Sequence, residues 1–93
     1  MKQTYKIRDY DAKKLSSLAN MTGDELMFLL RRLGITCRNY GLMCDPPIGT
    51  GAGVNYYRYH KKIPMRLIVP LVEKYPVIFL EDLLKQKYEN GKI

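Results

Sequence analysis

The stretch from Thr22 to Gly34 constrains the fold most, because it carries both a start signal and a stop signal for one helix. Thr22, followed three positions later by Glu25, is a capping box. Gly34 is the residue type that most easily takes the left-handed conformation at a helix C-terminus. The inner face of this helix is predicted to carry Leu26, Leu29, Leu30 and Leu33.

A shorter helix is predicted just before it. Asp9 or Asp11 can cap this helix, and its apolar residues have the spacing of one buried stripe: Ala12, Leu15, Leu18 and Ala19. Asn20 tolerates positive φ and Met21 can plug the turn, so residues 12–33 indicate a helix-turn-helix unit. Residues 1–8 indicate a short extended arm or edge strand.

After Gly34 the pattern changes to alternation. Residues 36–40 and 54–63 predict two strands, and the Pro- and Gly-rich residues 45–53 predict the flexible loop of a hairpin. Alternation in the second strand predicts a solvated side with Tyr56, Arg58, His60 and Lys62. The opposite side, with Tyr57, Tyr59, Lys61 and Ile63, is expected against the core.

Prolines divide the last third of the chain. Pro64 is well placed to begin a helix, and Pro70 predicts that this helix is kinked or split into two short pieces. Pro76 separates it from a last helix over about residues 77–89. That helix is expected to be buried through Ile78, Phe79, Leu83, Leu84 and Tyr88.

These elements, over residues 12 to about 63, resemble the winged helix-turn-helix superfamily. The resemblance implies an α+β fold, a helical core with a β-hairpin wing and C-terminal helices. A plain helical hairpin is the alternative, because it would show many of the same leucines. The chain of 93 residues is expected to form one domain.

A basic, tyrosine-rich stretch gives the clearest indication of a partner. The formal charge is +7, and seven cationic side chains lie within residues 31–66 against one acid, Asp45. Residues 55–62 read Asn-Tyr-Tyr-Arg-Tyr-His-Lys-Lys. Flat rings stack on nucleobases and cations neutralise phosphates, so this composition suits a nucleic-acid strand. The alternative is an ordinary exposed strand, where Tyr and Arg are common.

The candidate nucleic-acid-binding residues are Arg38, Tyr56, Tyr57, Arg58, Tyr59, His60, Lys61, Lys62 and Arg66. Tyrosines would stack on bases, cations would pair with phosphates, and His60 could donate a hydrogen bond when protonated. The start of the second helix argues against sequence-specific reading of a duplex, because Asp24 and Glu25 would repel phosphates.

Met27 and Phe28 are candidates for a protein contact. They face outward if the leucines of the same helix face inward, and exposed Met and Phe suit a protein partner better than DNA. Burial of both under the C-terminal helices remains the open alternative.

Catalysis, cofactor binding and membrane insertion are not expected. The single histidine, His60, has no evident acid or nucleophile partner, and residues 49–53 lack the Gly-Lys-Ser/Thr ending of a phosphate-binding loop. Cys37 and Cys44 are expected to be free thiols in a reducing compartment, with a bridge or a metal site as the alternative. The apolar runs are too short to cross a bilayer and no leader opens the chain, which predicts a cytoplasmic protein.

The predicted function is a small non-enzymatic protein that binds DNA, with single strands preferred. Over its whole length the chain also resembles small accessory proteins of phages and mobile elements, in particular the small middle protein of the replication operon of staphylococcal cassette chromosomes. That resemblance implies an A-family DNA polymerase as partner and a role in primer synthesis. The alternatives are a protein–protein adaptor without DNA contact, and a sequence-specific excisionase or repressor-type regulator.

Overall fold

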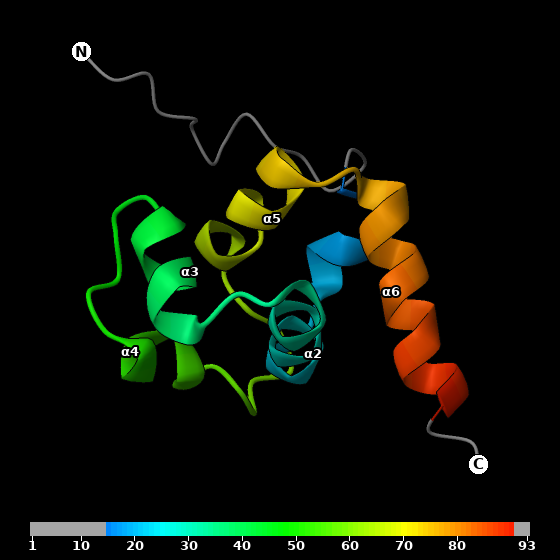
Figure 1. Ribbon diagram of the computed structural model, residues 1–93, viewed down its shortest axis with the longest axis horizontal. Helices are drawn as coiled ribbons and strands as arrows, with labels where there is room; N and C mark the ends of the chain where they lie inside the picture. The colour runs from blue at the N-terminus through cyan, green and yellow to red at the C-terminus, as the bar shows by residue number, and fades with distance from the viewer. Residues whose placement is uncertain (1–14, 91–93) are drawn as a thin grey trace.

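The computed structural model describes residues 15–90 as short helices joined by tight turns (Figure 1). In chain order these are the 3₁₀ helix η2 (Ser16–Asn20), α2 (Gly23–Leu33), α3 (Cys37–Met43), α4 (Gly51–Asn55), the 3₁₀ helix η3 (Met65–Leu67), α5 (Val69–Lys74) and α6 (Val77–Asn90). The expected arm over residues 1–8 and the expected caps at Asp9 and Asp11 lie outside the described residues.

The helix α2 lies centrally, with α6 along one side and α3 and α4 packed together on the other (Figure 1). The sequence predicted α2 correctly. The Thr22 hydroxyl accepts a hydrogen bond from the Glu25 N–H, and the Glu25 carboxylate accepts one from the Thr22 N–H. Gly34 ends the helix at φ 73°. Leu26, Leu29 and Leu30 are buried as expected, and Leu33 is half-buried.

Removing the capping box is expected to cost about 1 kcal/mol of stability, because the Thr22→Ala variant leaves a backbone donor of α2 without its partner. Thr22→Ser keeps the hydroxyl and is the matched control. Urea denaturation measures both variants, and equal stability of Thr22→Ala and the unsubstituted protein would contradict this role.

Residues 15–90 contain no β-strand, so the expected hairpin wing and the α+β winged helix-turn-helix fold are wrong. Two threonines that belonged to the predicted hairpin begin helices instead. Thr36 Oγ1 accepts a hydrogen bond from the Asn39 N–H at 3.1 Å and caps α3, while Thr50 Oγ1 accepts one from the Gly53 N–H at 3.0 Å and caps α4. The first predicted strand is therefore the start of α3, and α4 begins within the predicted loop.

The helices α3 and α4 are held by packing that the sequence pattern did not reveal. Tyr40 is fully buried, and its hydroxyl donates a hydrogen bond to the Leu67 carbonyl at 2.8 Å. Val54 is fully buried as well. A Cβ on Gly53 would lie 2.5 Å from Ile48 Cγ2, so the glycine-rich stretch is packed closely and is not a free loop tip.

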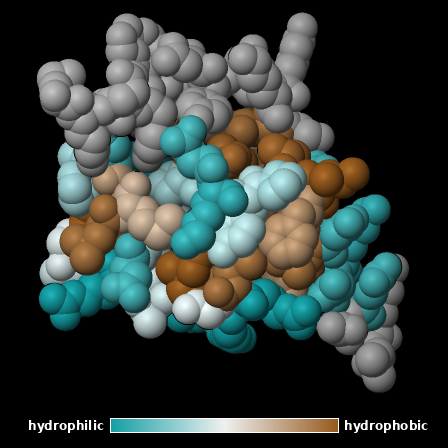
Figure 2. Space-filling model, turned by 45° about the horizontal axis from the view of Figure 1, so that its top comes forward, coloured by the Kyte–Doolittle hydropathy of each residue, from teal (hydrophilic) through white to brown (hydrophobic). Residues whose placement is uncertain are grey.

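The last third of the chain is split as the prolines predicted. Pro64 precedes η3, Pro70 lies in the first turn of α5, and Pro76 precedes α6. The predicted buried face of α6 is partly wrong, because Ile78 is 71% exposed and Tyr88 51% exposed. Phe79, also predicted to be buried, is 40% exposed. Leu83 is buried and Leu84 half-buried as predicted, and Leu80 is buried although it was not in the predicted set. On the face in Figure 2, hydrophobic residues show in several separate patches, with hydrophilic residues between and around them.

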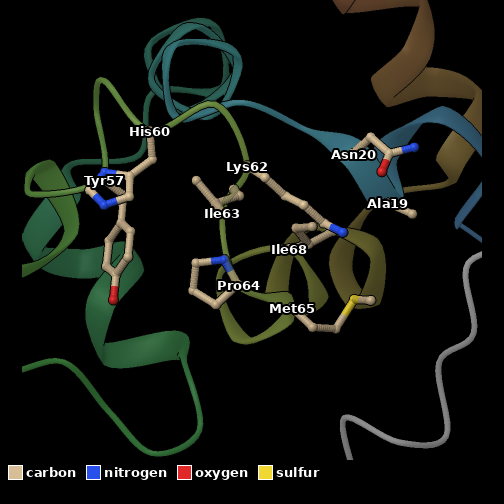
Figure 3. A pocket seen from close by; sticks show the side chains of 9 residues that line it. All are labelled: Ala19, Asn20, Tyr57, His60, Lys62, Ile63, Pro64, Met65 and Ile68. Atoms are coloured by element: carbon tan, nitrogen blue, oxygen red, sulfur yellow. The ribbon is translucent and has the colours of Figure 1, made fainter.

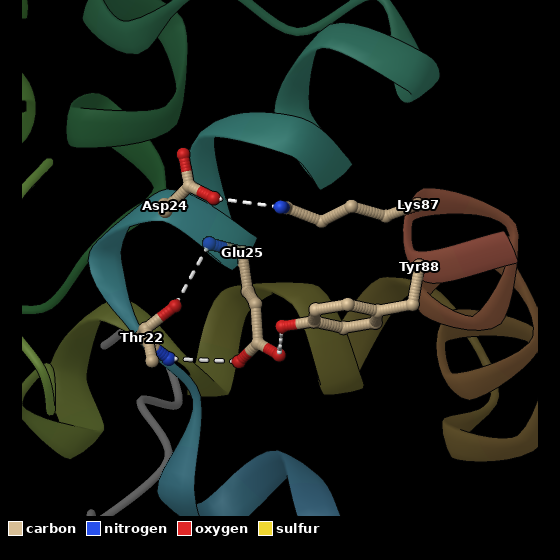
Figure 4. A network of polar contacts seen from close by, with 5 residues as sticks. All are labelled: Thr22, Asp24, Glu25, Lys87 and Tyr88. Atoms are coloured by element: carbon tan, nitrogen blue, oxygen red, sulfur yellow. Dashed lines mark hydrogen bonds and ion pairs between the residues drawn. The ribbon is translucent and has the colours of Figure 1, made fainter. Parts of the chain in front are cut away.

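Polar contacts fix α6 across the beginning of α2 (Figure 4). Lys87 Nζ pairs with the Asp24 carboxylate at 2.7 Å, and the Tyr88 hydroxyl donates a short hydrogen bond to Glu25. In the last turn of α2, the Arg32 guanidinium donates to Gln86 Oε1 at 2.7 Å. The acidic start of α2 is therefore engaged by the end of α6, and it is not an open edge for reading a DNA groove.

Stability is expected to fall as the pH rises from about 10 to about 12. The hydrogen bond to Glu25, and then burial, raise the pKa of Tyr88 from 10.0 to about 12. Because the neutral phenol is the donor, its contribution is complete below pH 10 and is lost as the pH passes the folded-state value. Denaturation at several pH values measures the slope, and Tyr88→Phe should make it shallower. An unchanged slope in that variant would contradict the contact.

No helix within residues 15–90 has the length and apolar character needed to cross a membrane.

Candidate nucleic-acid interface

Residues 55–62, which we name the tyrosine turn, leave the end of α4 as a compact series of turns and not as a strand. The Tyr57 N–H donates to the Val54 carbonyl at 3.1 Å, and the Arg58 N–H donates to the Asn55 carbonyl at 2.9 Å. These short-range bonds coil the backbone, so neighbouring side chains do not alternate between two faces.

The tyrosine turn is fixed against the beginning of α2. The Gly23 N–H donates to the His60 carbonyl at 2.8 Å, and the Ile63 N–H donates to the Met21 carbonyl at 3.2 Å. The approach is so close that a Cβ on Gly23 would lie 1.6 Å from the Tyr57 carbonyl oxygen. The rings of the turn are thus presented from a backbone that is anchored at both ends.

Three rings of the turn form a cluster. The centroids of Tyr56, Tyr57 and His60 lie 5.0 to 5.1 Å apart, with Tyr56 and Tyr57 edge to face. Tyr57 is half-buried against the core, whereas Tyr56 is 69% exposed. Tyr59 is 89% exposed and thus the most open ring of the turn. Tyr56 and Tyr59 are therefore the surfaces available for stacking.

The predicted two-sided pattern holds only in part. Tyr56, His60 and Lys62 are exposed as expected, and Arg58 is half-buried. On the side expected against the core, Ile63 is buried and Tyr57 half-buried, but Tyr59 and Lys61 are exposed. The prediction for Tyr59 and Lys61 is wrong because the segment is coiled.

The cations of the predicted site are not equivalent. Lys61 and Lys62 are exposed, and Arg58 Nε donates to Asn55 Oδ1 at 2.9 Å, which orients its guanidinium. Arg66 is half-buried and donates to the Pro46 carbonyl at 2.7 Å, so it holds the loop that follows α3. Arg38 is exposed on α3 beside Gly51, at the other end of α4 from the tyrosine turn.

The fold adds two cations that are not among the predicted binding residues. A hollow of about 250 Å³ is lined by Asp24, Met27, Phe28, Arg31, Arg58 and Lys87. It brings Arg31 of α2 and Lys87 of α6 next to Arg58 of the tyrosine turn. Arg31 follows Asp24 by two helical turns, so the two lie on the same face of α2, and this spacing could have been recognised in the sequence. The position of Lys87 depends on how α6 crosses α2, and no local pattern gives it.

Met27 and Phe28 were candidates for an exposed protein contact, with burial as the alternative. The structure shows that Met27 is buried. Met27 is 6% exposed, with its sulfur 3.8 Å from the Cys37 sulfur. Phe28 is half-buried and packs against the core. These two residues therefore do not form an exposed apolar pair.

A second and larger hollow adjoins the end of the tyrosine turn (Figure 3). It is a groove of about 660 Å³ that runs between η2, the end of the turn and η3. Its lining residues are Ala19, Asn20, Tyr57, His60, Lys62, Ile63, Pro64, Met65 and Ile68. Most of these side chains are apolar, in contrast to the cationic hollow near Arg58.

The two cysteines are free thiols in different surroundings. Cys44 is 3% exposed, and burial raises the pKa of its thiol from 9.0 to about 11 against the opposing charge of Arg66. Cys37 is half-buried. Among the described residues no three His, Cys, Asp or Glu side chains lie close enough together to hold a metal ion.

Cys37 is expected to react with iodoacetamide well before Cys44, because alkylation needs an accessible thiolate. Mass spectrometry of the digested protein gives the rate at each cysteine. In urea the two rates should converge, which is the internal control. Equal rates in the folded protein would contradict the burial of Cys44.

Comparisons of the chain with protein-family models, with curated proteins and with solved structures find no match.

Proposed function

We propose that the protein binds single-stranded nucleic acid through the tyrosine turn and does so without catalysing a reaction. The observation that carries the proposal is the exposure of Tyr56 and Tyr59 beside Lys61 and Lys62, in a turn without an acidic residue. Exposed rings next to cations form the stacking platform and the phosphate contacts that single strands need.

The surroundings of the turn support a path for a strand. Lys61 and Lys62 lie towards one end, and Arg58 lies where the turn meets the hollow that contains Arg31. Three cations line that hollow against a single acid, Asp24, which already pairs with Lys87. A strand whose bases stack on Tyr59 and Tyr56 would find cations for its phosphates in the turn itself and in the hollow that Arg58 lines.

Single strands are favoured over a specific duplex site. A helix that reads a major groove presents its first residues to the base edges. In this fold the first turn of α2 contacts α6 through Asp24 and Glu25, and Gly23 contacts the tyrosine turn. The groove-reading position is thus occupied by the protein itself.

The choice of DNA as the nucleic acid, and of an A-family DNA polymerase as the protein that this chain assists, rests on the whole-chain resemblance to the replication-operon protein. The DNA ligand and the polymerase partner are both part of the proposal. Copurification with a tagged polymerase, from a host that carries both genes, tests the polymerase partner.

Fluorescence anisotropy with a labelled single strand and the matching duplex, at several salt concentrations, tests the function. We expect tighter binding to the single strand and affinity that falls linearly with log salt, with a slope of about −0.7 for each phosphate contact. Tight binding confined to one duplex sequence would favour the regulator instead. No binding to either form in dilute buffer would favour the adaptor.

A further inference from the structure

The apolar groove between η2, the tyrosine turn and η3 has a volume of about 660 Å³, and of its lining residues the proposed nucleic-acid site uses Lys62 alone. We propose that this groove is a docking site for a partner protein, and that it takes a short acidic peptide segment with aliphatic or aromatic anchor residues. The proposal does not depend on the nucleic-acid function.

The walls of the groove are suited to apolar anchors. Ala19, Ile63 and Ile68 form a tightly packed base, each less than a tenth exposed. Met65 is half-buried at the side, and its unbranched thioether can adjust to anchors of different shape. The volume of about 660 Å³ is well within the range of sites that enclose a ligand, about 300 to 1,000 Å³.

The charges at the groove identify the chemistry of the segment. Lys62 lines it, and Lys61 is adjacent to Lys62 in the sequence. Among the described residues that line the groove, none is acidic. Acidic side chains next to the apolar anchors would therefore be attracted, and basic ones would be repelled.

Two other occupants fit less well. A nucleobase needs an open ring face, but Tyr57 and His60 pack against each other and against Tyr56, and the rest of the lining has no aromatic ring. A second copy of this chain would have to insert another surface, such as the exposed Ile78 side of α6. Such head-to-tail contacts generate rings or open chains of molecules, unlike the self-complementary contact of a two-fold dimer.

Shifts of methyl resonances on addition of synthetic peptides test the proposal. The alanine, isoleucine and methionine residues of the groove carry methyl groups that can be labelled for this measurement. The probe is a pool of short peptides with leucine or phenylalanine placed among aspartates and serines. It should shift the methyl resonances of Ala19, Ile63, Met65 and Ile68. A pool with lysine in place of aspartate, and a pool with serine in place of the apolar residues, should shift them far less. Equal shifts with all three pools, or no shifts with the first, would overturn the proposal.

Substitutions in the groove give the second readout. Met65→Glu and Lys62→Glu should each weaken binding of the acidic pool about tenfold or more. Met65→Glu places a negative charge on the apolar wall, and Lys62→Glu reverses the charge at the edge of the groove. Lys85→Glu on α6 is the charge-matched control and should leave affinity unchanged. The thermal transition of each variant shows whether it is folded. If Met65→Glu does not fold, the affinity of Lys62→Glu alone decides the test.

The experiment separates this site from the nucleic-acid site. Tyr59→Ala should weaken oligonucleotide binding and leave the peptide shifts intact, while Met65→Glu should do the reverse. If an oligonucleotide displaces the peptide from Met65, the groove holds a base and the proposal is overturned. If sedimentation shows self-association that Met65→Glu abolishes, a second copy is the occupant, and the proposal is overturned in that case as well.

Discussion

A Gly23→Ala variant is expected to lose about 3 kcal/mol of stability, because among the glycines within residues 15–90 an added methyl group meets the closest backbone contact here. The added Cβ would lie 1.6 Å from the Tyr57 carbonyl oxygen and 2.8 Å from the Arg58 carbonyl carbon. Both neighbours are backbone atoms, so the clash cannot be relieved by a side-chain rotation. The turn must move away, and the hydrogen bonds from Gly23 to His60 and from Ile63 to Met21 are lost with it.

Gly49→Ala is the matched control, because a Cβ at Gly49 meets no atom within 4 Å. It should change stability by no more than about 0.5 kcal/mol. Chemical denaturation of both variants, with tyrosine fluorescence or circular dichroism as the signal, measures the difference. If the two alanine variants are equally stable, the tyrosine turn is not docked on α2 as described.

Neutralising Lys61 and Lys62 together is expected to weaken binding to a single strand roughly 25-fold at about 0.1 M salt. The figure follows from two phosphate contacts, each of which contributes about 0.7 to the slope of log affinity against log salt. Both lysines are exposed, so the Lys61→Gln, Lys62→Gln variant should fold normally. Fluorescence anisotropy at several salt concentrations measures the affinity and the slope in the same titration.

The control removes the same number of charges elsewhere. Lys74 and Lys85 are also exposed, on α5 and α6, and their double glutamine variant has the same net charge. It should retain nearly full affinity and the original slope. Equal losses in the two variants would mean that the overall charge of the chain, and not the tyrosine turn, attracts the nucleic acid.

Local signals predicted some elements and not others, for a physical reason that is visible at three threonines. At Thr22 the side chain of Glu25 completes a reciprocal cap, and the helix was predicted. Thr36 and Thr50 cap α3 and α4 in the same way, but Asn39 and Gly53 stand in the third position and give no reciprocal bond. Five-residue and seven-residue helices offer too little periodicity to be told from strands.

The faces of α6 and of the tyrosine turn depend on long-range packing. Composition alone identified the turn as the candidate site, because its tyrosines and cations are adjacent in sequence. Which ring is open could not be derived, since the exposure of Tyr59 follows from the docking of the turn on Gly23. The approach of Arg31 and Lys87 to Arg58 follows from the crossing of α2 and α6.

The most direct test of the central claim is photo-crosslinking of the protein to a thymine-rich single strand, followed by mass spectrometry of the crosslinked peptides. Stacking of bases on the tyrosine turn predicts crosslinks at Tyr59 and Tyr56, and their loss when a competing unlabelled strand is added. Crosslinks concentrated instead at Tyr75 or Tyr88, with the turn unmodified, would contradict the assignment of residues 55–62 as the binding surface.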